Sequence, residues 1–214
     1  MLRTKGCLLL LCTISLLGCG QQYGARLAFA PEPACGFFQS LAGYRISWAA
    51  RTPVRLYVSK NWPVELKPVI LKAATIWNST NQNTYMTVSF DSGAVGISPA
   101  PDNLNGLYWM TSWSASRPSE QGVTTLRYKG ERATEADVRI NAKNFKFYDE
   151  SPDQPSDIHL SSLLVHEFGH FLGLTHAYVS SSVMYPFLPA STKREQLYSS
   201  ELEALACEYG GGAL

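Results

Sequence analysis

Short stretches of the chain alternate between apolar and polar residues, which is the period of a half-buried β-strand. In the first of them, Val54, Leu56 and Val58 alternate with Arg55 and Tyr57. The same pattern predicts further strands at 86–90, 107–113, 123–128 and 136–140. Together these segments would supply a sheet of about five strands.

Three other segments have apolar residues at helical spacing and predict α-helices. They lie at 67–79, at about 158–172 and from 200 to about 210. Asp157 is placed to cap the second helix, and Ser200 with Glu203 forms a capping box for the third. The order strand, helix, several strands, helix, loop, helix predicts a single α/β (α+β) domain.

The last predicted strand has one apolar and one polar side. Ala136, Val138 and Ile140 face one way, whereas Asp137 and Arg139 face the other. A strand with a polar face can lie at the border of a sheet. We therefore expect this segment to be an edge strand.

Composition narrows the class of protein. The 214 residues are 45% hydrophobic and 12% aromatic, which argues against a disordered or fibrous chain. The formal net charge is +1, from 18 basic and 17 acidic residues, so nucleic acid is not expected as a partner. The five cysteines are an odd number, so the fate of each one has to be considered.

The first 18 residues have the pattern of a signal peptide. Arg3 and Lys5 precede an uncharged apolar run over 7–17, which is shorter than the roughly 20 residues that cross a bilayer. Cys19 follows Leu-Leu-Gly, and this sequence resembles the lipobox of bacterial lipoproteins. The resemblance implies that Cys19 is lipidated after cleavage and anchors the protein in a bacterial cell envelope. Gly20 at the next position implies sorting to the outer membrane.

Cleavage after the sequence Ala28-Phe29-Ala30 is the alternative, and it would release a secreted protein.

These features divide the chain into three parts. They are a lipoprotein signal peptide at 1–18, a tether at 19–43 and the folded domain at 44–214. Cys7 and Cys12 leave with the signal peptide, and Cys19 carries the lipid. Cys35 and Cys207 remain, and in an oxidising compartment such a pair is expected to form a disulfide.

One segment carries recognisable chemistry, the sequence HEFGH and the residues that follow it. His166 and His170 are four residues apart, so on a helix both imidazoles can bind one zinc ion. Glu167 lies beside them and can take a proton from a water at the metal. Gly173 permits a turn that brings His176 to the same metal. Three imidazoles leave a fourth position for water, as a catalytic zinc site requires.

This segment resembles the extended zinc signature of the metzincin metalloproteases. The sequence SVMYP, which contains Met184, looks like the methionine turn of that group and is closest to the matrixin form. The resemblance implies one catalytic Zn²⁺ held by His166, His170 and His176, with Glu167 as the general base and Met184 as an apolar floor. It also implies a twisted, mostly parallel sheet of about five strands with an antiparallel edge strand and three main helices.

In matrixins the edge strand pairs with the extended substrate as an added β-strand. By resemblance, that role falls here on Ala136, Asp137, Val138, Arg139 and Ile140. The alternative is an ordinary sheet edge without a part in binding.

Several parts of the matrixin pattern do not match. We find no cysteine-switch propeptide, and the segments that hold the family's structural zinc and calcium ions are not evident. Cys35 is an alternative candidate for blocking the zinc, but a disulfide with Cys207 is favoured. Phe187-Leu188 after Pro186 departs from the family's aromatic pattern, so its cleavage preference is not transferred.

The sequence thus predicts a monomeric zinc endopeptidase that cleaves polypeptide substrates and is attached to a membrane through lipidated Cys19. Two alternatives remain open. One is a hydrolase of cell-wall peptide crosslinks, and the other is a non-catalytic envelope binding protein in which zinc only stabilises the fold.

Overall fold

The structure is a computed structural model that describes residues 33–80, 83–91 and 93–210. The predicted signal peptide 1–18 and the predicted lipidation site Cys19 lie outside these ranges. None of the helices in the described ranges is long and apolar enough to cross a membrane.

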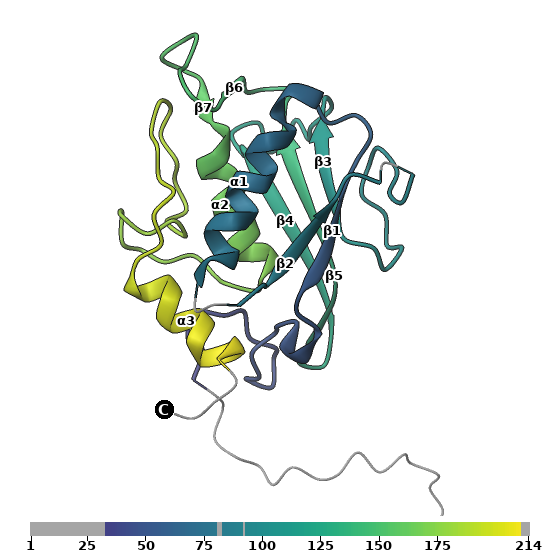
Figure 1. The fold of residues 1–214 in the computed structure, drawn as a ribbon, viewed down its shortest axis with the longest axis vertical. Helices are drawn as coiled ribbons and strands as arrows, with labels where there is room; N and C mark the ends of the chain where they lie inside the picture. The colour runs from purple at the N-terminus through teal and green to yellow at the C-terminus, as the bar shows by residue number, and fades with distance from the viewer. Residues whose placement is uncertain (1–32, 81–82, 92, 211–214) are drawn as a thin grey trace, which may run out of the picture. The chain divides into compact units, whose positions relative to one another are not determined.

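Five strands form one sheet in the order β2-β1-β3-β5-β4 (Figure 1). The strands are β1 (Val54–Val58), β2 (Met86–Ser89), β3 (Gly106–Met110), β4 (Gly122–Lys129) and β5 (Arg132–Asn141). All neighbouring pairs are parallel except β4 and β5, which run antiparallel. The predicted fold class, a mostly parallel five-stranded sheet with an antiparallel edge strand, is confirmed.

The predicted identity of the edge strand is wrong. β5, which contains Ala136–Ile140, lies between β3 and β4, and β4 is the edge. The polar side of β5 is covered rather than exposed. Asp137 is 2% exposed and accepts a hydrogen bond from the Gly106 N–H at 3.1 Å, and the Arg139 guanidinium lies 5.6 Å from the centre of the Trp113 ring. Polar partners on this side give the strand the sequence pattern of an edge.

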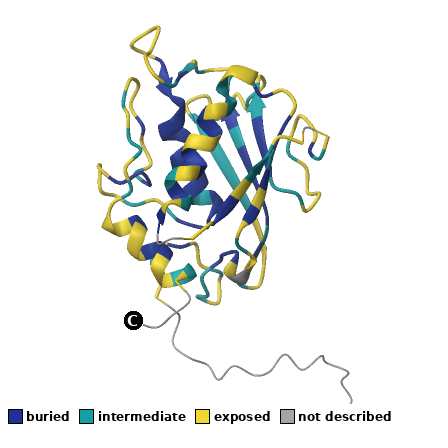
Figure 2. Cartoon of the chain, in the orientation of Figure 1, coloured by how far each residue is buried: buried dark blue, intermediate teal, exposed yellow. Residues whose placement is uncertain are grey.

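Two helices lie side by side on one face of the sheet, α1 (Lys67–Asn78) and α2 (Leu160–Phe171) (Figure 1). The Trp77 indole N–H of α1 donates to the Val165 carbonyl of α2 at 2.9 Å. Figure 2 shows that α2 is buried along nearly its whole length, because helix α1 and the sheet cover it. The remaining elements are α3 (Ser199–Tyr209), the short helices η1 (Ala49–Arg51) and η2 (Val64–Leu66), and a pair of short strands, β6 (Phe147–Tyr148) and β7 (Ile158–His159).

Both helix caps differ from the predicted ones. Strand β7 occupies the residues after Asp157, so α2 starts later and its cap is His159, whose ring nitrogen accepts the Ser162 N–H at 3.3 Å. The capping box of α3 is formed by Tyr198 and Glu201, two residues before the predicted pair.

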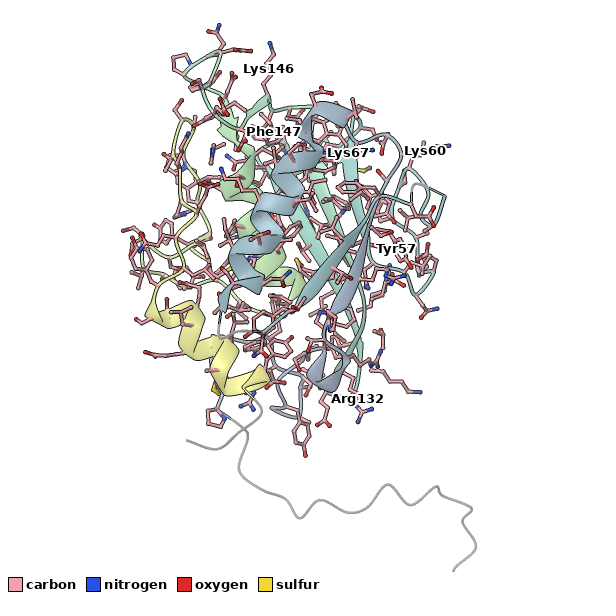
Figure 3. All side chains as sticks on the ribbon, viewed as in Figure 1. Tyr57, Lys60, Lys67, Arg132, Lys146 and Phe147 are labelled. Atoms are coloured by element: carbon pink, nitrogen blue, oxygen red, sulfur yellow. A yellow bond between two sulfur atoms is a disulfide. The ribbon has the colours of Figure 1, made fainter. Side chains whose placement is uncertain are left out.

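The folded domain begins earlier than the expected residue 44. Cys35 forms a disulfide with Cys207 of α3, which confirms the predicted pair, so Cys35 does not act as a metal ligand here. Phe37 is 2% exposed and forms an isolated antiparallel bridge with Leu174. The part of the predicted tether from residue 35 onward thus belongs to the domain. Figure 3 shows charged side chains such as Lys60 and Arg132 projecting outward from this framework.

Candidate active site

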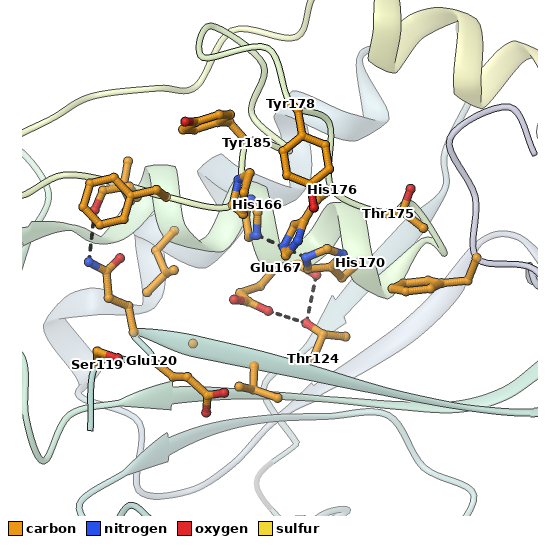
Figure 4. Close-up of a pocket in the computed structure, with 18 residues that line it drawn as sticks. Ser119, Glu120, Thr124, His166, Glu167, His170, Thr175, His176, Tyr178 and Tyr185 are labelled. Atoms are coloured by element: carbon orange, nitrogen blue, oxygen red, sulfur yellow. Dashed lines mark hydrogen bonds between the residues drawn. The ribbon is translucent and has the colours of Figure 1, made fainter. Parts of the chain in front are cut away.

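Two of the three predicted metal ligands lie on one face of α2. The Nε2 atoms of His166 and His170, one helical turn apart, are 3.1 Å from each other. Gly173 then takes a φ of +104°, and a β-carbon at this position would lie 2.6 Å from the Ile46 carbonyl oxygen. The resulting turn places the ring of His176 with its centre 5.3 and 4.8 Å from the other two (Figure 4).

Backbone carbonyls determine which ring nitrogens carry protons. His166 Nδ1 lies 2.8 Å from the Val183 carbonyl oxygen, and His170 Nδ1 lies 2.7 Å from that of Leu174. A carbonyl oxygen can only accept, so each Nδ1 donates and each Nε2 is left with a lone pair. Two lone pairs that face each other at 3.1 Å repel unless a cation lies between them. This arrangement fits a metal ion that takes imidazole ligands.

The electrostatic environment keeps these rings neutral. Burial, the neighbouring His170 and, further off, His176 lower the pKa of His166 to about 3. Burial and His176 lower the pKa of His170 to about 4. The ligand nitrogens of all three histidines lie within 4.8 Å of one another, so the three form one cluster. Neutral imidazole is the form that binds a metal ion.

Glu167 extends from α2 toward the sheet and is 3% exposed. The Thr124 hydroxyl of β4 donates to its Oε2 at 2.6 Å (Figure 4). Burial raises the pKa of Glu167 to about 7, although the Thr124 hydrogen bond and the Arg139 charge oppose the shift. A carboxyl group in this range can accept and release a proton near neutral pH.

Met184, for which the resemblance predicted the role of an apolar floor, packs against α2 at Gly169, between the two helix histidines in the sequence. It is 1% exposed, and its sulfur would lie 2.2 Å from a β-carbon built on Gly169 of α2. The turn that carries it is tied to the site, because the preceding residue, Val183, supplies the carbonyl that accepts from His166. The Met184 carbonyl accepts the N–H of Ala177, the residue after the third histidine, at 2.9 Å.

An open cleft of about 670 Å³ runs past this cluster. One side is formed by β4 and the residues before it, and the other by the segment after Met184. Among its lining residues are Phe38, Gly122, Val123, Leu163, Tyr185 and Leu188. Figure 4 shows the histidines and Glu167 between these two walls, with Tyr178 and Tyr185 nearby.

The free edge of β4 borders the cleft. The Asn141 N–H of β5 donates to the Gln121 carbonyl at 2.9 Å, so this carbonyl points toward β5. Alternate residues of an antiparallel strand point the same way, and the pairing is regular from Gly122 to Arg127. The backbone N–H and C=O groups of Gly122 and Thr124 therefore point outward, where an added strand could pair with them.

A second cluster of histidine and carboxylate groups lies away from the cleft, at the start of α2. It consists of Asp149, His159 and Glu195. The Lys72 ammonium lies 2.8 Å from Glu195 and 3.4 Å from Asp149, so a cation is already present. Both ring nitrogens of His159 have partners, namely Ser162 and the Asp149 carbonyl. This cluster joins loops to the helix and is not a metal site.

The structure brings together His166, Glu167, His170, His176 and Met184 as predicted, whereas Ala136, Val138 and Ile140 of β5 lie in the core. Sequence reasoning missed Gly122 and Thr124. Neither belongs to a recognisable motif, and each lies about 40 residues from α2 in the chain, so only the strand order could have revealed them.

The fold and the three-histidine cluster are those of the metzincin class. The Matrixin family model matches residues 65–210, more than half of the chain, and the chain belongs to this family.

Three curated plant proteins are similar to short parts of the chain. Metalloendoproteinase 5-MMP of Arabidopsis thaliana is 35% identical over 54 residues, which are 25% of this chain and 15% of the relative. Metalloendoproteinase 2-MMP of the same plant is 38% identical over 53 residues, 25% of this chain and 14% of the relative. Metalloendoproteinase 1 of Glycine max is 37% identical over 51 residues, 24% of this chain and 17% of the relative. The chain thus spans less than one fifth of the length of each of these relatives.

Proposed function

We propose that this protein is a zinc-dependent endopeptidase that uses Glu167 as its general base. The single observation that carries the proposal is the convergence of three imidazoles and one buried carboxylate in an open cleft. His166, His170 and His176 would hold the zinc ion, the first two through the Nε2 atoms that their backbone contacts leave with a lone pair. Zinc bound there would supply a Lewis acid for the substrate carbonyl and lower the pKa of the attacking water.

The residues of the chain account for the proton movements. Glu167 takes one proton from the attacking water while the oxygen of that water forms a bond to the peptide carbon. Glu167 then gives that proton to the amide nitrogen as the carbon–nitrogen bond breaks. The products are a new amine and a new carboxylic acid, so one water molecule is consumed for each bond cleaved.

The substrate would bind as an extended strand along β4, not along β5. The outward backbone groups of Gly122 and Thr124 are positioned to pair with a peptide chain beside Glu167. A strand that pairs through its backbone accepts many sequences, which suits a protease for unfolded polypeptides. The Tyr185 to Leu188 segment on the opposite wall would contact substrate side chains.

The test compares the wild-type protein with Glu167→Gln on a mixed peptide library, with and without a chelator. Wild type should cleave internal bonds, lose activity with the chelator and regain it with zinc. Glu167→Gln should retain zinc and lose about 10²- to 10⁴-fold in kcat. Equal turnover by the two proteins would rule out the proposed base.

Two alternatives to this function can be distinguished by which substrates, if any, the protein cleaves. Cleavage of purified peptidoglycan but not of unstructured peptides would indicate a cell-wall hydrolase. A zinc-loaded protein that cleaves neither would indicate a binding protein stabilised by its metal.

We also propose that Cys19 is lipidated and anchors the protein in a bacterial envelope, a hypothesis supported by the Leu-Leu-Gly-Cys sequence. Incorporation of a labelled fatty acid into the wild-type chain but not into Cys19→Ala would support it. A soluble product cleaved after Ala30 would contradict it.

A further inference from the structure

Thr124 contacts Glu167 at two points. Its hydroxyl lies 2.6 Å from the Oε2 atom of the carboxylate and 3.1 Å from the backbone carbonyl oxygen of the same residue. A hydroxyl has one proton, and the shorter contact to the carboxylate is the stronger bond. The edge strand β4 thus holds the side chain of a residue on α2.

Gly122 shapes the other half of the carboxylate environment. It lies two residues before Thr124, so both positions face the same side of the strand. A β-carbon built on Gly122 would lie 2.7 Å from Oε1 of Glu167 and 3.1 Å from both Cγ and Cδ. Gly122 does not have a positive φ, so the backbone does not require glycine there. What the position lacks is space for a side chain beside the carboxylate.

These two contacts give the two carboxylate oxygens different surroundings. Oε2 receives the Thr124 hydroxyl, whereas no described residue donates a hydrogen bond to Oε1, which lies over Gly122 at the cleft. A glutamate side chain rotates about three bonds, and a base that wanders from its productive position loses much of its effect. With Oε2 held by Thr124, Oε1 is the oxygen for which no donor is found among the described residues, and so the one open to accept a proton.

We propose that Thr124 is a positioning residue for the general base, holding Glu167 so that Oε1 takes the proton, while Gly122 leaves room for that orientation. The inference rests on the proposed peptidase function. It adds a role for the edge strand beyond substrate pairing, because the residue that orients the base also has its backbone groups at the free edge. A peptide paired along β4 would therefore restrain the strand that holds the base.

The experiment uses the full zinc-loaded protein with Thr124→Val, which keeps the shape of the side chain but removes the donor. Thr124→Ser restores the donor. Thr125→Val is the matched control, because it makes the same change on the opposite face of the same strand, where the hydroxyl lies 3.4 Å from the Arg139 guanidinium and does not contact Glu167. Gly122→Ala tests the space beside Oε1. For each variant, kcat and KM on one peptide, zinc affinity by chelator competition and thermal unfolding are measured.

Thr124→Val should lower kcat by about 10- to 100-fold, which is part of the roughly 10²- to 10⁴-fold that a general base contributes. The same variant should change KM by less than about twofold. Thr124→Ser should recover to within about threefold of wild type, and Thr125→Val should not differ from wild type. Gly122→Ala should lower kcat although every donor is present. Zinc affinity should be unchanged throughout, because Thr124 contacts no metal ligand.

A value of kcat for Thr124→Val within about twofold of wild type would overturn the inference, as would equal losses in Thr124→Val and Thr124→Ser. If Thr124→Val does not fold, Thr124→Ala replaces it, and the comparison with Thr124→Ser decides the question. An inactive wild-type protein would contradict the proposed function instead. An active wild type, an inactive Glu167→Gln and an unaffected Thr124→Val would contradict only the inference.

Discussion

The sulfur of Met184 rests against the α-carbon of Gly169, at the only glycine of α2. A β-carbon built on Gly169 would lie 2.2 Å from Met184 Sδ and 3.0 Å from Cζ2 of Trp77. Gly169 of the HEFGH sequence is therefore needed because a larger residue would not fit at this position. It lets the methionine turn approach the helix between the two histidines, and that turn supplies the carbonyl that orients His166.

Gly169→Ala should destabilise the fold, even though alanine is the better helix former. The added carbon forces either Met184 or Trp77 to move, and overpacking of this kind costs about 1–3 kcal/mol. Urea unfolding of the metal-free protein measures the loss. Gly96→Ala is the control, since its added carbon would meet only ordinary contacts at 3.7 Å or more. Unchanged stability of Gly169→Ala would show that Met184 can relax.

Removal of the Cys35–Cys207 disulfide should reduce both stability and metal affinity. The bond closes a loop of 172 residues, and loss of a native disulfide costs about 2–5 kcal/mol. The Gly36 carbonyl accepts the Thr175 N–H at 2.7 Å, so the disulfide also holds the segment just before His176. The double variant Cys35→Ser/Cys207→Ser is compared with wild type by urea unfolding and zinc competition. A reductant should weaken wild type but have no effect on the double variant.

Asp137→Asn should stabilise the protein at neutral pH. Burial, with help from Glu135 and Asp102, raises the pKa of Asp137 to about 6 from an ordinary value of 3.8. The folded state therefore favours the protonated carboxyl, and ionisation of Asp137 lowers the free energy of unfolding. This loss grows between about pH 4 and 6 and stays constant at higher pH. This pKa shift corresponds to a loss of roughly 1–3 kcal/mol in the free energy of unfolding at neutral pH.

Urea unfolding of wild type and Asp137→Asn at pH 4, 5, 6 and 7.5 tests this. The variant should be more stable at pH 7.5, and the difference should vanish near pH 4. Asparagine retains an oxygen that can accept the Gly106 N–H. A variant that is less stable at pH 7.5 would contradict the expected sign.

Arg194 should matter for substrate binding without touching the substrate. Its guanidinium donates to the carbonyls of Ser180, Tyr185 and Phe187 at 3.2, 3.3 and 3.0 Å, and so fixes the wall of the cleft from behind. Lysine cannot reproduce this fork of donors. Arg194→Lys should speed amide hydrogen exchange over 180–188 and raise the KM for peptides by about 3- to 10-fold, about 1 kcal/mol of binding. Lys193→Arg, at the neighbouring residue, should change neither.

Local patterns predicted the elements well. The alternation in Val54–Val58 reproduces strand β1 residue for residue, and the apolar stripe of α2 reproduces that helix to within two residues at its N-terminus. The spacing of apolar residues reflects which face of a strand or helix packs on the core, so it can be read from the local sequence. The candidate metal ligands were found for the same reason, because two of them are neighbours on one helix.

Strand order could not be predicted in this way. The polar residues of β5 mimic a solvent-exposed face, but Asp137 accepts a hydrogen bond from Gly106, and the Arg139 guanidinium contacts Thr125 and the Trp113 ring. Those partners come from other strands and loops, so no local pattern shows them. The same limit applies to Thr124, which reaches the site only because β4 and α2 pack together.

The position of β1 has a practical consequence for anyone who expresses this domain. The family match begins at residue 65, after β1, yet β1 lies inside the sheet and pairs with both β2 and β3. A recombinant fragment cut at that boundary would split the sheet and leave two strands with unpaired edges, which invites aggregation. A fragment that starts before Cys35 keeps both β1 and the disulfide with Cys207, so the packed domain is larger than the part covered by the family match.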